Sequence, residues 1–350
     1  MMEQRVEDSA LATRLAATAN PQLSSSFFSV LPAEIRRMIY VEYWRHNCLY
    51  EDAGEHTSTG DSTHKYHIIN KVRFGSTVRY THSPCVVSDQ NSHDFRMGRL
   101  DLARGQDSEV HTWARRIETD WAVHWPCEEL YKNTTRRPQS TFMPALLTCK
   151  LMYRECIESI YENLTFVFTD TTTAESFIDL HPPPTLRSLE LCIRLPVFLT
   201  ELYCPPSFQH HPRVSSPDHP GFDAHDNPWA TLCNALAHRI TLRRLNIWLD
   251  IQNLRAWDER VWERRLLKPL AAVSVPRECF TLALPELGPL GKGRGEKNGR
   301  TYLEGEYLDR APFEVKRAPR PNYTEAYLAR MLANTTLLTI DAGPAHGGAT

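Results

Sequence analysis

Apolar residues near the start of the chain recur with the period of a helix. They stand four positions apart, at Leu31, Ile35, Ile39 and Tyr43. Within 27–44 this spacing predicts an amphipathic helix, and Pro32 suits its first helical position, where the missing N–H costs nothing. The apolar stripe either packs into the protein's own core or docks a partner, and periodicity leaves both possibilities open.

A second helical pattern covers residues 142–163, FMPALLTCKLMYRECIESIYEN. Its apolar stripe consists of Leu146, Cys149, Tyr153, Cys156 or Ile157, and Ile160. We interpret Cys149 as a small buried hydrophobe rather than a nucleophile, because the segment contains no histidine to activate it. The alternation in LTFVF at 164–168 predicts a strand directly after this helix.

The chain between these two helices is mixed in character. Residues 51–65 are polar and predict a loop, whereas YHIINKV and STVRYTHSPCVV each predict a short strand. Farther on, Trp113, Trp121 and Trp125 share one face of a predicted helix. Nearby charge is balanced, so we expect this tryptophan face to be buried rather than to stack on a base.

The C-terminal half alternates helical and strand patterns. LRSLELCIRL at 186–195 and LRRLNIWLDI at 242–251 both predict half-buried strands, and a helical stretch precedes each of them. A third helix leads to CFTLALPEL. The series predicts an α/β fold, with α+β as the alternative, built on a curved parallel or mixed sheet with helices on one side. The spacing is only loosely that of leucine-rich repeats.

Two stretches, LPAEIRRMIY and ALLTCKLMYRECIESIYENLTFVF, carry a family resemblance. In this order they resemble a fungal F-box-like family of domains of unknown function, whose pattern runs roughly LPxEIRxxIY and then LLxTCRxIYxEAxxxLYxxNTFxF. In an F-box the second helix follows soon after the first, whereas here residues 45–140 intervene. The later helix would carry Cys149, Lys150 and Tyr153.

The resemblance implies a substrate receptor or adaptor rather than an enzyme. It implies that the N-terminal helices bind a Skp-type adaptor of a cullin ubiquitin ligase while the C-terminal half presents a surface to an unknown protein client. The residues that it assigns to partner binding are Leu31, Pro32, Ile35, Ile39 and Tyr43.

The patterns predict four segments along the chain. We expect a disordered tail over 1–26, an F-box-like helical segment over 27–163 that contains the insertion, an α/β domain over 164–340, and a disordered tail over 341–350. Within the α/β domain, 205–227 and 288–300 are expected to be a disordered loop and a glycine-rich loop.

Composition narrows the classes of protein. With 350 residues, of which 41% are hydrophobic and 23% charged, the chain is typical of globular proteins. The 40 Lys and Arg nearly balance the 42 Asp and Glu, so we expect no nucleic-acid partner and no attraction to anionic membranes. The start shows no signal-peptide pattern and no stretch is apolar enough to span a bilayer, which predicts a cytoplasmic or nuclear location.

Chemical motifs are weak in this sequence. The nine cysteines are scattered without a CxxC pair, which favours reduced thiols over disulfides or a zinc ribbon. GPLGKGRGEKNGR at 288–300 lacks the first glycine and the final Ser or Thr of a phosphate-binding loop. The histidines and aspartates at 209–229 lack the spacing that fixes metal geometry.

We therefore expect a non-enzymatic interaction protein with no cofactor and no metal. The alternative is an enzyme with a metal or phosphate site in the 209–229 or 288–300 loop, whose residues converge only in three dimensions.

Overall fold

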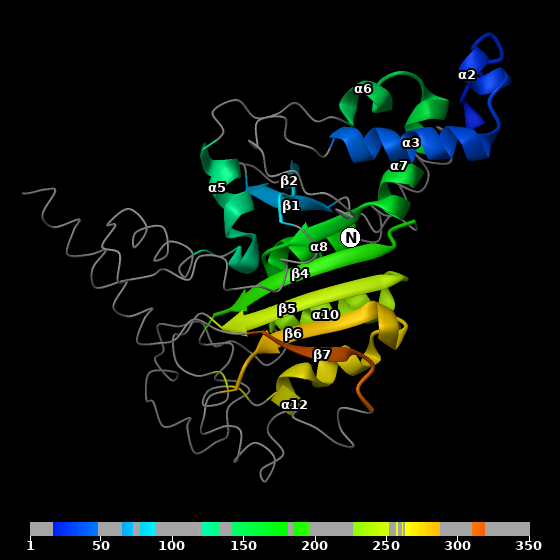
Figure 1. Ribbon diagram of the computed structural model, residues 1–350. Coiled ribbons are helices and arrows are strands. Elements are labelled where there is room, and N and C mark those ends of the chain that lie inside the picture. Colours follow the sequence, from blue (N-terminus) through cyan, green and yellow to red (C-terminus); the bar gives the residue numbers. More distant parts are fainter. Residues whose placement is uncertain are drawn as a thin grey trace, which may run out of the picture.

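The computed structural model describes residues 17–47, 65–72, 78–87, 119, 121–133, 142–180, 185–196, 227–251, 257, 261, 263–287 and 310–318. Its centre is a seven-stranded sheet of order β2-β1-β3-β4-β5-β6-β7 (Figure 1). The strands are β1 Lys65–Val72, β2 Val78–Pro84, β3 Thr165–Phe168, β4 Ser188–Leu195, β5 Arg244–Ile251, β6 Phe280–Pro285 and β7 Glu314–Ala318. Only β1 and β2 pair antiparallel, and every other neighbouring pair is parallel. The predicted mixed α/β class is confirmed.

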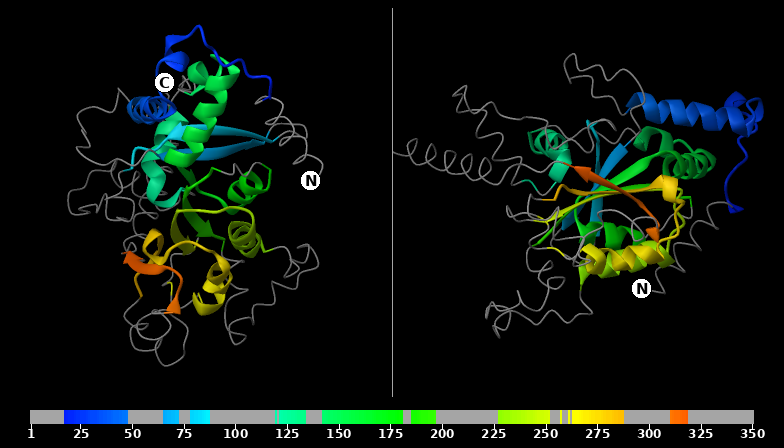
Figure 2. Two further views of the ribbon diagram at one scale, coloured as in Figure 1. Left: turned by 90° about the vertical axis from the view of Figure 1, so that its right-hand side faces the viewer. Right: turned by 60° about the horizontal axis from the view of Figure 1, so that its bottom comes forward.

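Helices connect the successive parallel strands from β3 to β6 and lie against one face of the sheet (Figure 2). The connecting helices are α8 Thr171–Leu180, α10 Pro228–His238, α12 Glu263–Leu267 and the 3-10 turn η5 Lys268–Ala272, followed by η6 Arg277–Cys279. At the start of α10, the Asn227 side chain accepts hydrogen bonds from the backbone N–H groups of Trp229 and Ala230, which stabilises the helix end that Pro228 begins.

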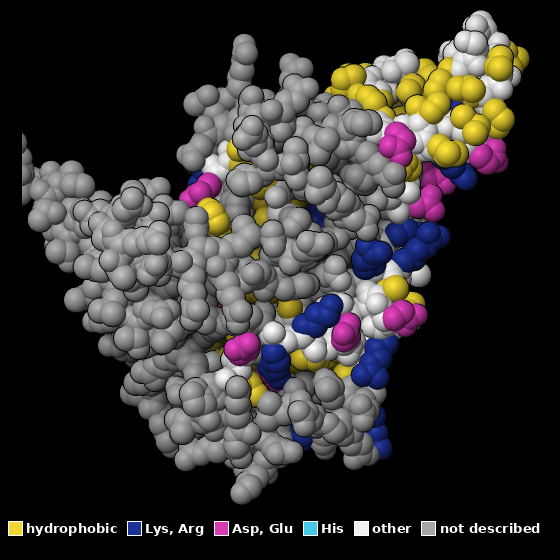
Figure 3. Space-filling model, in the orientation of Figure 1, with side chains coloured by type: hydrophobic (Ala, Val, Ile, Leu, Met, Phe, Trp, Pro, Cys, Tyr) yellow, Lys and Arg dark blue, Asp and Glu magenta, His cyan; other side chains and the backbone are white. Residues whose placement is uncertain are grey.

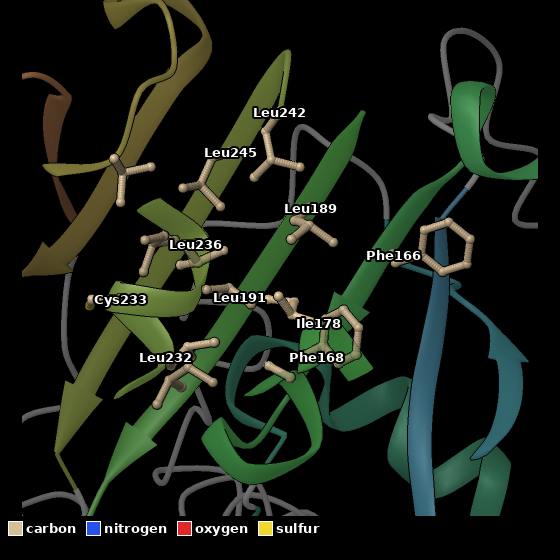
Figure 4. Close-up of a cluster of buried hydrophobic side chains, with 14 of the residues drawn as sticks. Phe166, Phe168, Ile178, Leu189, Leu191, Leu232, Cys233, Leu236, Leu242 and Leu245 are labelled. Atoms are coloured by element: carbon tan, nitrogen blue, oxygen red, sulfur yellow. The ribbon is translucent and has the colours of Figure 1, made fainter. Parts of the chain in front are cut away.

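The core under these helices follows from strand alternation. Leu189 and Leu191 of β4 and Leu245 of β5 point at Leu232 and Leu236 of α10, and all five are buried (Figure 4). Alternate positions on the same strands point to the other face of the sheet. The strands are buried on both faces, which explains their nearly continuous apolar runs.

The second face is covered by the 3-10 turn η2 Ala122–His124 and by α5 Trp125–Asn133. Ala122 and Val123 pack against Val167 of β3, Cys192 of β4 and Trp248 of β5. Both covering elements, like β1 and β2, come from the predicted insertion at 45–140. The insertion therefore contributes two strands to the sheet and closes part of its second face.

The N-terminal helices lie at the β1–β3 end of the molecule (Figure 1). They are α2 Ser26–Ser29, α3 Ala33–Asn47, α6 Met143–Leu146 and α7 Lys150–Asn163. Two predicted boundaries are corrected. α3 begins at Ala33, one residue after the predicted first position at Pro32, and the helix predicted over 142–163 is broken before α7. At this break Cys149 caps the start of α7, because its Sγ accepts a hydrogen bond from the Met152 N–H (3.4 Å).

No helix within the described ranges is long and apolar enough to cross a membrane.

Candidate functional site

The two halves of the sequence signature meet in the structure, because α3 packs on α7. Arg36 Nε and Nη2 donate to the two carboxylate oxygens of Glu155 at 2.9 and 2.6 Å, and the Tyr40 O–H donates to the same carboxylate at 2.9 Å. One turn on, Trp44 Nε1 donates to Ser159 Oγ at 3.1 Å. Burial would raise the pKa of Glu155, but the hydrogen bonds from Arg36 and Tyr40 hold it below its ordinary value.

The other side of α3 faces solvent. Ile35 and Ile39 are each 41% exposed and Met38 is 64% exposed. Residues three and four apart adjoin on a helix, so these three side chains form one apolar strip. We call this strip, together with Leu31, Pro32 and Tyr43, the α3 surface.

Exposed apolar side chains are concentrated around the α3 surface. Of the large hydrophobic residues that are exposed in the described ranges, all but Val86 belong to α2, α3, α6, α7 or the segments beside them. They are Leu23, Val30, Ile35, Met38, Ile39, Tyr43, Met143, Leu147 and Tyr153. Figure 3 shows this yellow area at the upper right of the molecule.

The structure therefore keeps the predicted partner-binding residues together on one helix and its entry. Pro32 and Tyr43 are exposed and Leu31 is partly buried. A hollow of about 370 Å³ lies beside the surface, lined by Arg37, Met38, Val41, Glu42, Glu162 and Asn163. The apolar strip is thus bordered by charged and amide side chains.

A second candidate site lies buried between the sheet and the elements η2 and α5 that cover its second face. His67 comes from β1, Cys85 follows β2 directly, His124 ends η2, and Cys127 is in the first turn of α5. We call these four residues the His–Cys cluster. The two sulfurs are 3.8 Å apart, and His124 Nδ1 lies 3.3 Å from Cys85 Sγ and 3.8 Å from Cys127 Sγ. One ligand atom from each of the four residues lies within 4.8 Å of all the others.

Glu190 of β4 orients the cluster from the sheet side. Its Oε1 lies 2.8 Å from His124 Nε2, and its Oε2 lies 2.6 Å from the Lys65 ammonium. Burial opposes the charge on Glu190, but His124 and Lys65 hold its pKa well below the ordinary value. The contact at Nε2 places the Nε2 proton of His124 towards the carboxylate, so its Nδ1 faces the two sulfurs.

His67 is the most unusual member of the cluster. It is 1% exposed, its ring stacks on Trp121, and the edge of its ring meets His124, with both centroid distances at 4.7 Å. Neither ring nitrogen has a hydrogen-bond partner among the described residues. Burial lowers the pKa of His67 and favours the neutral ring.

The two thiols of the cluster differ in acidity. Burial raises the pKa of Cys85 to about 11. Burial also opposes ionisation of Cys127, yet hydrogen bonds from Cys85 and His124 bring the pKa of Cys127 down to about 5. Burial would lower the pKa of His124, but the neighbouring thiols raise it well above its ordinary value.

Backbone strain accompanies the cluster. Ala122, two residues before His124, has a φ of 53°, in the left-handed region that disfavours residues with a Cβ. Such strain persists where the surrounding structure fixes it, and it is common at functional sites.

The sequence interpretation did not include the His–Cys cluster. The available signal was the pair His124-x-x-Cys127, which places two ligand types one helical turn apart. His67 and Cys85 give no signal by spacing, because the antiparallel pairing of β1 and β2 is what brings them together. Of the three tryptophans that were predicted to be buried, Trp121 is buried and stacks on His67, and Trp125 is partly buried. Trp113 lies outside the described residues.

The two loops considered for enzyme chemistry cannot be placed. The loop at 209–229 lies outside the described residues except for its last three positions, and the loop at 288–300 lies outside them entirely.

Fold and sites together define an α/β protein with an exposed apolar helix at one end of its sheet and a buried histidine–cysteine cluster on one face. Residues 20–289 match the family model described as "Domain of unknown function (DUF7730)", so the chain belongs to that family. The matched range runs from before α2 to just past β6 and includes both candidate sites. No curated protein and no solved structure matches the chain.

Proposed function

We propose that the protein is a non-enzymatic protein–protein interaction module, an F-box-like substrate receptor whose α3 surface binds a Skp-type adaptor of a cullin ubiquitin ligase. The observation that carries this proposal is the exposure of Ile35, Met38 and Ile39 on a helix whose opposite side is already anchored. Contiguous exposed apolar side chains on a globular protein mark partner sites.

Anchoring of α3 supports a preformed binding surface. Arg36, Tyr40 and Glu155 occupy positions that the F-box-like pattern specifies, and in this chain they bond to one another. A helix held in place by such contacts loses little conformational entropy when a partner binds. Fully burying an Ile or Met side chain contributes about 1.5–3 kcal/mol, so a partner that covers the strip gains enough to offset part of the association cost.

The chemistry of the surface fits an adaptor with an apolar groove. An amphipathic helix laid into such a groove presents residues at i, i+3 and i+4, which is the spacing of Ile35, Met38 and Ile39. The exposed side chains of Glu34, Arg37 and Glu42 flank the strip and supply a polar rim. The proposal places the protein in the cytoplasm or nucleus and assigns the client to the C-terminal α/β half.

Titration calorimetry of the untagged full chain against a purified Skp-type adaptor tests the proposal. We expect Ile35→Asp and Ile39→Asp each to weaken binding at least tenfold, because each places a carboxylate inside an apolar contact. Ser274→Asp is the matched control, since it adds the same charge at an exposed position after η5 and should leave the affinity unchanged. Circular dichroism verifies that each variant is folded.

Two results would refute the proposal. One is a wild-type chain that does not bind the adaptor, and the other is a folded Ile35→Asp variant that binds as tightly as the wild type. The enzyme alternative has no support from the described residues, because its two loops lie almost wholly outside them.

A further inference from the structure

We propose that His67, Cys85, His124 and Cys127 bind one Zn²⁺ in a closed structural site. A tetrahedral zinc with Zn–S near 2.3 Å and Zn–N near 2.0–2.1 Å requires ligand separations of about 3.8 Å between sulfurs and about 3.6 Å between sulfur and nitrogen. The two sulfurs are 3.8 Å apart, and the two distances from His124 Nδ1 are 3.3 and 3.8 Å. The side chains are thus already arranged around the position of one ion.

The surroundings of His124 are those of a metal ligand. Zinc-bound histidines commonly donate their second ring N–H to a carboxylate, which fixes the ring and makes it a better ligand. Here Glu190 Oε1 lies 2.8 Å from His124 Nε2, and Lys65 holds the other carboxylate oxygen. The free lone pair on Nδ1 is left to face the two sulfurs.

The ion would also satisfy the charges and the polar atoms of the cluster. Two thiolates balance the double charge of Zn²⁺, and Lys65 balances Glu190, so the buried group as a whole is neutral. His67 is 1% exposed, and neither of its ring nitrogens has a hydrogen-bond partner in the described part of the chain. A bond to zinc provides one, which accounts for an otherwise costly burial.

The ligand set selects zinc and a structural role. Two thiolates and two imidazoles in tetrahedral order suit Zn²⁺, and four protein ligands leave no open position for substrate. A two-iron cluster with histidines on one iron and cysteines on the other needs room between the two pairs. The short distances from His124 Nδ1 to both sulfurs leave none.

Cys192 lies outside this ligand set. Its sulfur is 3.8 Å from Glu190 Oε1, on the side of His124 that faces the carboxylate. We therefore treat Cys192 as a neighbour of the cluster and use it as a control.

A zinc ion here would join parts of the insertion to one another. His67 and Cys85 belong to the β1–β2 pair, whereas His124 and Cys127 belong to the segment that covers the second face of the sheet. The ion would fasten this covering segment to the edge strands. The long insertion between α3 and α7 would then be held in its fold by a metal.

Metal analysis of the full chain, purified and freed of any affinity tag, tests the site together with X-ray absorption at the zinc edge. We expect about one equivalent of zinc, with two sulfur neighbours at about 2.3 Å and two nitrogen neighbours at about 2.0–2.1 Å. Less than about a tenth of an equivalent, a stoichiometric metal other than zinc, or a coordination shell without two sulfurs would overturn the proposal.

Substitutions locate the ion within the chain. Cys127→Ala and His67→Ala should each lower the zinc content at least tenfold, whereas Cys192→Ala and Cys233→Ala should keep one equivalent. Cys233 is the matched control, because it is a fully buried free cysteine on α10, in the core on the opposite face. Full zinc in a folded Cys127→Ala variant contradicts the proposal.

The absorption spectrum of the wild-type protein decides the question if the ligand variants do not fold. Replacement of zinc by Co²⁺ should give the visible bands of a tetrahedral site and thiolate charge-transfer absorption. An octahedral Co²⁺ spectrum, or one without thiolate bands, counts against the cluster.

Discussion

The α3 surface and the His–Cys cluster are unusual in opposite ways: apolar side chains are exposed at the first, and charged side chains are buried beside the second. At the α3 surface, Ile35 and Ile39 each remain 41% exposed, whereas beside the cluster the charged Lys65 and Glu190 are 3% and 4% exposed. The exposed part of the apolar strip contributes little to the stability of the isolated chain, because it already contacts water. A buried charge is tolerated only while its partner is present. Substitutions at the two sites should therefore differ sharply in their effect on folding.

The largest effect is expected from Glu190→Gln. It removes the carboxylate that Lys65 and His124 share, and with it the negative charge 2.6 Å from the buried Lys65 ammonium. Breaking a buried ion pair in this way costs about 3–5 kcal/mol, measurable as a fall in the free energy of unfolding in urea at pH 7. Glu158→Gln on the exposed side of α7 is the control and should change stability by less than about 0.5 kcal/mol. A loss at Glu190 as small as that of the control would mean that the pair is not buried.

Arg36→Met should have an intermediate effect. It deletes two charge-assisted hydrogen bonds to Glu155 at a partly buried interface, and bonds to charged groups contribute about 1.5–3 kcal/mol. The adjacent Arg37→Met removes the same charge from an exposed position and should be nearly neutral. Equal effects of the two substitutions in urea unfolding would show that the α3–α7 contact does not hold the helix.

A smaller effect is expected from pH, acting through Glu155. Its folded pKa is lowered from 4.5 by Arg36 and Tyr40, although burial acts in the opposite direction. A carboxylate with a depressed pKa contributes stability that is fully present above its unfolded pKa and is lost as the pH falls through the folded value. The stability difference between wild type and Glu155→Gln should therefore narrow between pH 6 and pH 3.

The same measurement in an Arg36→Met background sharpens this test. Without Arg36, the stability difference caused by Glu155→Gln should narrow less as the pH falls, because the hydrogen bond from Arg36 is the largest influence that lowers the pKa of Glu155. A stability difference that widens towards low pH would contradict a lowered pKa for Glu155 in the folded protein.

The fold was predictable from the sequence where alternation alone decides it. The patterns at 186–195 and 242–251 correspond to β4 and β5, and the helical stretches before them correspond to α8 and α10. β7 was not predicted, because EVKRA at Glu314–Ala318 has few apolar positions and its place at the sheet edge requires few.

The sites were less predictable because distant pairing creates them. The periodicity of α3 fits burial of either Ile35 and Ile39 or Tyr40 and Trp44. The second pair is the buried one, and its partners Glu155 and Ser159 come from α7, more than a hundred residues away along the chain. The His–Cys cluster depends in the same way on strand pairing and on the segment that covers the sheet. Neither can be recognised from the spacing of residues along the chain.

The smallest effect on folding is expected at the α3 surface itself. Ile35→Ser and Ile39→Ser truncate side chains that are 41% exposed, so each should lower the free energy of unfolding by no more than about 1 kcal/mol. Ile160→Ser is the matched control, because Ile160 is the same residue type on α7 but is 4% exposed. Truncating a buried isoleucine costs about 2–5 kcal/mol. Urea unfolding of the three variants separates the two environments. If Ile39→Ser is as destabilising as Ile160→Ser, the strip is covered by the chain itself, and no apolar surface remains for a partner to bind.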